Sequence, residues 1–407
     1  MNSFQNFYES PVASKIFSKQ IVNTGRQIEL DLWKAVLIFI MIVMHVQEVV
    51  FGDSWISYTL CNRSRPFLFF NKAIYPIGAT IFMFSMGCTI NFSRHQEMKT
   101  CFQRGLHLLL TFFCLNVIRG VFTAFFLAKW NGSKYIPNWI NSFFFNDILL
   151  LASLFYFYYG FLKLCKLSFR GIFLVTTGLF ILSNFIPPVH IGGNPDSAGN
   201  IALNQFLGCF VFINKTISPF PLCNWALVAI LGIAFGKLLQ HCFDKDTFYA
   251  ILTWVGLIGL SFFFYFLIQK HTFSSINLND KDFNLLNFHR ANYGSVLYSI
   301  LHFCLYAGLF YQLMVRLRNW KKKFLFNFIN YCSKNLTVLY FIHWPIVTCI
   351  AAVCCGSYKK MKPYSIQNGT IWLAIFGVYA ATLLLSWLYN YLLCMFRKRN
   401  TPQAAKK

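Results

Sequence analysis

The chain has 407 residues, of which 57% are hydrophobic and 19% aromatic, while only 12% are charged. A soluble protein of this length needs more polar surface, so the composition predicts an integral membrane protein. The formal net charge of +24 would suit a nucleic-acid partner, but Lys and Arg cluster at the ends of apolar runs, which is the positive-inside pattern of membrane proteins. We therefore expect a lipid bilayer around the protein and no nucleic acid.

The chain has no obvious soluble domain. Its first 29 residues contain no apolar core before the first membrane span and do not resemble a signal peptide. We divide the chain into a cytoplasmic N-terminal segment (1–29), a transmembrane domain (30–396) and a basic cytoplasmic tail (397–407). The 14 Cys include no C-x-x-C pair, so neither a disulfide framework nor a metal site is expected.

Apolar runs of about 20 residues predict membrane-spanning helices. In chain order they cover 30–50, 69–90, 106–128, 146–164, 171–186, 222–239, 248–269, 293–314, 327–355 and 371–396. The ninth is long, and a short interfacial piece is expected before it. The predicted fold class is all-α, a polytopic bundle of about ten transmembrane helices.

The loops predict an orientation. With the N-terminus in the cytoplasm, the inner segments hold 21 of the 36 Lys and Arg, and the outer segments hold 12. This bias places both termini in the cytoplasm, and we expect the plasma (inner) membrane of a bacterium. The two longest outer loops, 187–221 and 270–292, are expected to overhang a site that opens outward.

The first predicted helix carries polar side chains at membrane depth, where charges are costly and usually face a cavity or the bundle interior. They are Asp31, Lys34, His45 and Glu48. At about 100° per residue, His45 lies roughly 20° around the helix from Lys34 and about 16 Å along it. All four side chains therefore share one stripe, with Asp31 placed to neutralise Lys34.

His45 is the first candidate for chemistry. One interpretation of a lone membrane His is a structural one, in which it only hydrogen-bonds within its bundle. Here, however, Glu48 follows at i+3, within reach of the imidazole. A carboxylate there would orient the ring and raise its basicity, as it does for a general base. His45 and Glu48 are therefore the predicted catalytic pair.

The third predicted helix brings further basic groups. Arg104 and His107 enter it from the cytoplasm at i and i+3. Arg104 alone would also suit an ordinary positive-inside anchor. Arg119 lies deeper, in the outer half of the helix, where it either needs a partner or extends outward to the membrane surface. Asp147, at the start of the fourth helix, is one candidate partner.

The ninth helix contains His343, followed by Trp344 and Pro345. A proline inside a membrane helix frees a backbone carbonyl that a cavity or a neighbour must satisfy. A kinked helix with a hydrogen-bonded His is one interpretation, and a role in the site is the other. Residue types leave both open.

Together these segments resemble the acyltransferase-3 family. Lys34-x10-His45, preceded by Leu30-Asp31, resembles the first-helix motif of that family, and Ile342-His343-Trp344-Pro345 is similar to a segment of one of its late helices. Residues 75–90 and 219–239 look more like the related heparan-α-glucosaminide N-acetyltransferase group. Two positions depart from the family pattern: Lys34 stands for an Arg, and His107 for the second Arg of an R-x-x-R motif.

The resemblance implies a membrane acyltransferase that uses acetyl-CoA or another acyl-CoA from the cytosol. The acceptor would be a hydroxyl or amine of an extracytoplasmic carbohydrate or glycolipid, as in polysaccharide modification. His45 would act as general base or carry the acyl group itself. Residues expected to bind the donor are Lys34, Arg104, His107 and Arg119, and possible additional site residues are Asp31, Asp147, His343 and Trp344.

Two other functions remain open. The same buried charges suit a transporter or flippase of a lipid-linked glycan. The other alternative is a membrane acyltransferase of a different fold, centred on His343, in which His45 is structural.

Overall fold

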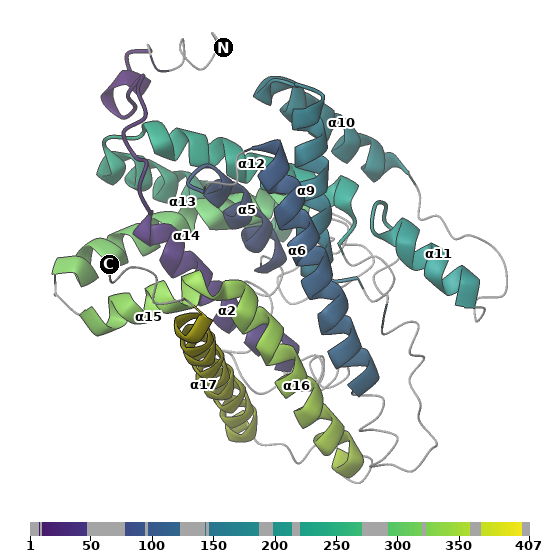
Figure 1. The fold of residues 1–407 in the computed structure, drawn as a ribbon. Coiled ribbons are helices and arrows are strands. Elements are labelled where there is room, and N and C mark those ends of the chain that lie inside the picture. Colours follow the sequence, from purple (N-terminus) through teal and green to yellow (C-terminus); the bar gives the residue numbers. More distant parts are fainter. Residues whose placement is uncertain are drawn as a thin grey trace, which may run out of the picture.

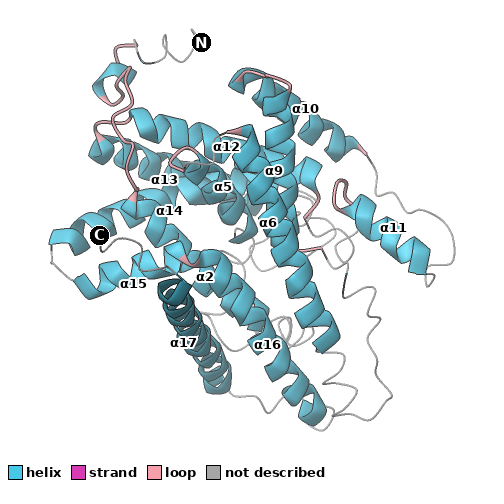
Figure 2. Ribbon diagram, viewed as in Figure 1, coloured by secondary structure: helices cyan, strands magenta, loops and turns pink. Residues whose placement is uncertain are grey.

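The computed structural model describes residues 8, 10–46, 78–93, 97–122, 143, 146–186, 198–213, 220–270, 292–319, 323–358 and 368–400. These residues form helices and connecting turns, with one isolated bridge between Phe17 and Cys242 and no strand (Figure 2). The predicted all-α fold class is confirmed.

The helices follow the predicted spans closely (Figure 1). In chain order they are α2 (Ile28–His45), α5 (Gly78–Ile90), α6 (Met98–Asn116), α9 (Ile148–Leu164), α10 (Phe169–Phe185), α11 (Ala198–Gly208), α12 (Leu222–His241), α13 (Lys245–Lys270), α14 (Tyr293–Asn319), α15 (Lys323–Lys334), α16 (Leu336–Tyr358) and α17 (Asn368–Asn400). A π-helical turn, Val117–Phe122, continues α6.

Within the described ranges, five helical stretches are long and apolar enough to cross a membrane. They lie in α6, α12, α13, α14 and α17, and shorter apolar helices accompany them. The protein is therefore an integral, multi-pass membrane protein. The count of ten spans and the cytoplasmic position of both termini stay predictions.

Two predicted segments differ from the structure. The ninth span is not continuous from residue 327: α15 ends at Lys334 and α16 starts at Leu336, so α15 is the short piece expected before the span. The outer segment 187–221, predicted as a loop, contains the helix α11. The second predicted loop, 270–292, lies almost wholly outside the described residues.

α2 lies at the centre of the bundle. It packs against α5, α14, α15, α16 and α17, and most side chains along it are buried. Trp33, 2% exposed, stacks on Phe303 of α14 with ring centroids 5.4 Å apart. A helix that is apolar on all sides belongs inside a bundle, so the few polar side chains of α2 face interior space.

α5 and α12 approach so closely that their backbones touch. A Cβ on Gly87 would lie 1.9 Å from the Ala229 carbonyl oxygen, and one on Gly232 would lie 2.1 Å from that of Phe84. Small residues permit such contact between membrane helices. These glycines therefore set the position of α5 beside α2.

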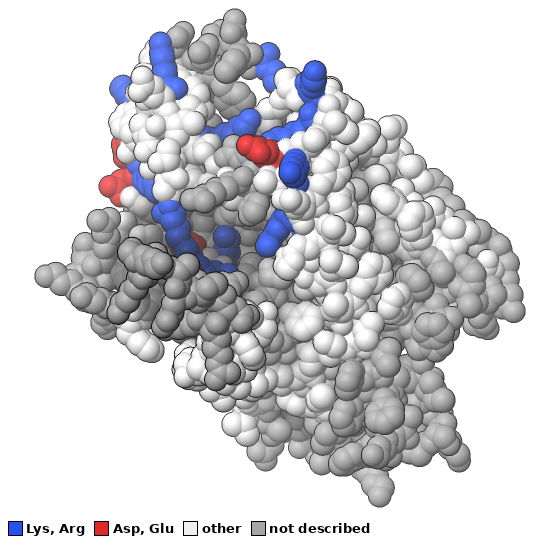
Figure 3. Space-filling view, viewed as in Figure 1, with Lys and Arg blue, Asp and Glu red and all other residues white. Residues whose placement is uncertain are grey.

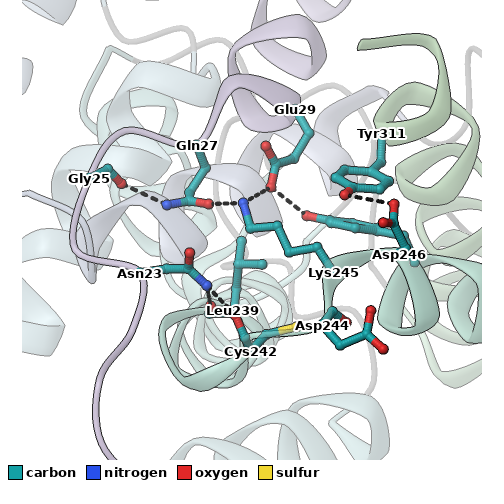
Figure 4. A network of polar contacts seen from close by, with 11 residues as sticks. Asn23, Gly25, Gln27, Glu29, Leu239, Cys242, Asp244, Lys245, Asp246 and Tyr311 are labelled. Carbon is teal, nitrogen blue, oxygen red and sulfur yellow. Dashed lines mark hydrogen bonds and ion pairs between the residues drawn. The ribbon is translucent and has the colours of Figure 1, made fainter. Parts of the chain in front are cut away.

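The segment before α2 is fastened to the turn between α12 and α13 (Figure 4). The Asn23 side chain donates to the Leu239 carbonyl at 2.9 Å, which satisfies one of the free carbonyls at the end of α12. Glu29, 5% exposed, accepts hydrogen bonds from Lys245 Nζ at 2.8 Å and from the Tyr249 hydroxyl at 3.1 Å. The entry of α2 is thus fixed by residues more than 200 positions away.

The same turn starts α13 with a capping residue. Asp244 accepts a hydrogen bond from the Thr247 backbone N–H at 3.1 Å. Hydrogen bonds from the Thr247 side chain and backbone lower the pKa of this exposed carboxyl. The cap therefore stays ionised at neutral pH.

Charge is unevenly distributed over the molecule. On the face drawn in Figure 3, Lys and Arg side chains gather at the end that holds the N-terminal segment and the starts of α10 and α13, with a few acidic side chains among them. The rest of the described surface on that face is largely uncharged. This is the distribution expected when one end meets the cytoplasm.

Candidate functional site

Two histidines from distant parts of the chain meet inside the bundle. Nδ1 of His45, at the end of α2, lies 2.7 Å from Nε2 of His343 in α16, and the two rings are nearly parallel. The other nitrogen of His343, Nδ1, lies 3.2 Å from the Leu339 carbonyl oxygen one turn earlier. His343 is completely buried, whereas His45 is partly exposed. Of the two residues, His45 is therefore the one nearer to open space.

Aromatic side chains of α16 hold the His45 ring. Trp344 packs on it with centroids 4.1 Å apart, and Tyr340 meets it edge-on at 6.2 Å. Pro345 lies inside α16 without ending the helix. The segment around His343 thus supplies both a hydrogen-bond partner and an aromatic wall for His45.

A buried ion pair lies beside this wall. Arg119, in the π-helical turn after α6, places its guanidinium 4.6 Å from the centre of the Trp344 ring. Its Nη1 lies 3.9 Å from Oδ2 of Asp147, and its Nη2 donates to the Asn116 side chain at 2.5 Å. Arg119 is therefore paired with Asp147, the candidate partner named from the sequence. π-helical turns occur often at functional sites.

A cavity of about 150 Å³ opens farther along the stripe. Three cations line it: Lys34 of α2, Arg104 of α6 and Lys334 at the end of α15. None of the described residues that line it is acidic. Hydroxyl groups complete the wall, from Ser85, Thr89, Tyr156, Ser333, Thr337 and Tyr340. Cations and hydroxyl groups in a lining without a carboxylate are the groups that bind phosphate.

Tyr340 connects the cavity to the histidine pair. It lines the cavity, and its ring centroid is 5.2 Å from that of His343. Lys34 therefore lines the cavity, whereas His45 lies outside its lining and approaches it through Tyr340. That both side chains face one cavity stays a prediction.

The other predicted residues are placed as follows. Asp31 is bound by Arg26 and accepts a hydrogen bond from Ser333 at 2.6 Å. It therefore fastens α15 to α2, in addition to its attraction for Lys34. His107 is exposed and is not among the residues that line the cavity. Glu48 lies outside the described residues.

Sequence reasoning missed two contributors. Lys334 was not singled out, because it lies inside the ninth predicted span, 327–355, whereas in the structure it ends α15. Tyr340 was not singled out, although it stands three residues before His343, on the same side of the helix. The direct contact between His45 and His343 was not predicted either, since nothing in the sequence links residues 298 positions apart.

Comparison with known proteins agrees with this arrangement. The family model of the acyltransferase-3 family, described as an acyltransferase domain, matches residues 27–391. The match includes every site residue named above except Arg26, which lies just before it. No curated protein and no solved structure matches the chain. The likeness to the heparan-α-glucosaminide N-acetyltransferase group stays a resemblance. The family match covers most of the sequence, and the chain belongs to the acyltransferase-3 family of membrane acyltransferases.

Proposed function

We propose that the protein transfers an acyl group, acetyl in the simplest case, from cytosolic acyl-CoA to a hydroxyl or amine of a carbohydrate outside the membrane. The observation that carries this proposal is the partly exposed residue His45, which Tyr340 separates from a cavity lined by three cations. The donor phosphates would bind Lys34, Arg104 and Lys334. The thioester arm would then extend past Tyr340 toward His45.

His45 has two possible roles in such a transfer. As a general base it takes the proton from the acceptor while the acceptor oxygen or nitrogen attacks the thioester carbonyl. The carbon–sulfur bond breaks, and the thiolate of CoA leaves and is protonated. As a nucleophile His45 first forms an acyl-imidazole and releases CoA, and the acceptor then takes the acyl group from the ring.

The buried cation Arg119 suits either course. A tetrahedral intermediate places a negative charge on the former carbonyl oxygen, and fixed donors near that oxygen lower the barrier. The Arg119 guanidinium and the His45 ring both pack on Trp344. The positive charge of Arg119, although paired with Asp147, would favour an anion beside Trp344.

The proposal predicts that His45→Ala abolishes acyl transfer, by about 10²-fold at least. The measurement is the transfer of labelled acetyl from acetyl-CoA to extracted surface glycan in proteoliposomes. His302→Ala is the matched control, because His302 is also a buried membrane His but lies in α14, hydrogen-bonded to the Tyr298 carbonyl at 2.9 Å. Full transfer by His45→Ala would refute the proposal.

The same preparation separates the alternatives. Movement of a lipid-linked glycan across the bilayer without acyl transfer would identify a flippase. Activity that survives His45→Ala and is lost with His343→Ala would indicate a site centred on His343. Label retained on the wild-type protein without acceptor, and absent from His45→Ala, would indicate covalent transfer.

A further inference from the structure

The hydrogen bonds of His343 determine its protonation pattern. A backbone carbonyl only accepts hydrogen bonds, so Nδ1 of His343, which faces the Leu339 oxygen at 3.2 Å, carries a hydrogen. In a neutral imidazole the other nitrogen is then an acceptor. Nε2 of His343 therefore accepts a hydrogen bond, and its partner at 2.7 Å is Nδ1 of His45.

This fixes the state of His45 in turn. If Nδ1 of a neutral His45 donates to His343, its Nε2 carries no hydrogen and presents a lone pair. His343 is 0% exposed, so no water competes for its acceptor nitrogen. We propose that His343 is a positioning residue that holds His45 in the tautomer with hydrogen on Nδ1, which leaves Nε2 as the atom that takes a proton or an acyl group.

The catalytic role of Nε2 rests on the proposed function. The tautomer of His45 does not, because it follows from the hydrogen bonds alone. An orienting His343 differs from the arrangement expected from the sequence, in which the carboxylate of Glu48 orients the His45 ring. A neutral His343 adds no negative charge to the site. When His45 gains a proton on Nε2, its Nδ1–H bond to His343 becomes charge-assisted and so strengthens. The Leu339 carbonyl accepts the hydrogen bond from the opposite nitrogen of His343, Nδ1, and so keeps the ring in place.

The surroundings keep this chain of hydrogen bonds in place. Leu339 and His343 are one helical turn apart, so the helix itself aligns the carbonyl with the ring. Trp344 and Tyr340 flank both rings. Among the described residues, Arg119 is the charged group near the pair, and it is paired with Asp147. The direct partner of His45 among the described residues is therefore the acceptor nitrogen of His343.

Two substitutions of similar size distinguish the loss of the hydrogen-bond acceptor from a change in side-chain shape. In His343→Gln the amide oxygen can accept from His45 while the amide nitrogen donates to the Leu339 carbonyl. His343→Met fills similar space without an acceptor. We expect His343→Gln to stay within about tenfold of the wild-type kcat and His343→Met to lose on the order of 10²–10⁴-fold. Neither should change KM for the acyl donor, since the cation-lined cavity is intact.

A direct readout of the ring covers the case in which His343→Met does not fold. Nitrogen-15 NMR of histidine-labelled wild-type protein, with His45 assigned from its absence in His45→Ala, should show the tautomer with hydrogen on Nδ1. A ring with hydrogen on Nε2, or a wild-type kcat for a folded His343→Met, overturns the proposal. If His45→Ala retained activity, the proposed function would fail, whereas the NMR result would still decide the tautomer.

Discussion

Asp147 uses its two carboxylate oxygens for two different purposes. Oδ1 accepts hydrogen bonds from the backbone N–H groups of Leu149 and Leu150, at 2.8 and 3.2 Å, and so caps α9. Oδ2 faces Arg119 at 3.9 Å. One side chain thus both starts a helix and balances the cation beside the histidine pair. A buried charge that loses its partner is much more costly than a lost cap.

We therefore expect Asp147→Asn to keep the cap but to destabilise the protein by about 3 kcal/mol, because Arg119 is left unbalanced. Asp147→Ala should cost about 1 kcal/mol more, since the cap is lost as well. Denaturant unfolding in detergent micelles measures both. In the double variant with Arg119→Met, the Asp147→Asn cost should shrink. Equal costs with and without Arg119 would show that the pair does not interact.

For single residues, the sequence was informative where the chemistry of a side chain limits the type of partner that it needs. A buried Arg needs a carboxylate, and Asp147, one of the partners considered from the sequence, does pair with Arg119. The partner of His45 was assigned to Glu48 from helical spacing, while His343 came into contact only through the packing of α16 on α2. Local spacing cannot show which distant helix will lie alongside.

The contact between α5 and α12 controls one wall of the cavity. α5 contributes Ser85, Met86 and Thr89 to that wall, and Gly87 lies between them against the α12 backbone. A side chain at this position has to push α5 away from α12. Because α5 also packs against α2, which contributes Lys34 to the cavity, the displacement reaches the cavity.

Gly87→Ala should therefore destabilise the protein by about 1–3 kcal/mol, the usual cost of overpacking, and raise KM for the acyl donor. Thermal unfolding and donor titration measure the two effects. Gly178→Ala is the matched control, because a Cβ there meets nothing within 4 Å. A Gly87→Ala protein with normal melting and normal KM would contradict the close contact.

Helix positions were predicted well because membrane spans follow from apolar runs, and boundaries were predicted less well. The run from residue 327 contains no proline or glycine near Asn335, so the short piece was expected to end before residue 327 and not at this position. The structure ends α15 just before this residue, whose side chain donates to the Tyr331 carbonyl at 3.0 Å and accepts from Asn390 of α17 at 3.1 Å. The break thus depends on a partner in the last helix.

The whole molecule has a consistent orientation. The N-terminal segment contacts the α12–α13 turn, since Phe17 pairs with Cys242 and the Asn23 side chain reaches the Leu239 carbonyl. Both segments must therefore lie on the same side of the membrane. The positive-inside count assigned both to the cytoplasm, and their shared position agrees with an even number of crossings between them.

This orientation predicts which residues react with a membrane-impermeant thiol reagent. Cys165, exposed in the turn between α9 and α10, should be labelled only from the cytoplasmic face in a variant that keeps no other Cys. A second variant with Ser14→Cys as its single Cys should behave in the same way, because Ser14 is exposed in the N-terminal segment. Labelling of either one from outside intact cells would reverse the orientation and place the cation-lined cavity on the wrong side for a cytosolic donor.

The distance along the chain between His45 and His343 has a consequence for biosynthesis. When α2 leaves the ribosome, 298 positions separate His45 from the residue that will bind it. Lys34 must likewise wait for α15 and α16, which form much of its cavity. The nascent protein therefore carries an unsatisfied polar stripe until translation is nearly complete. Chains that stop before α16 keep this defect permanently, which makes them natural substrates for membrane quality-control proteases.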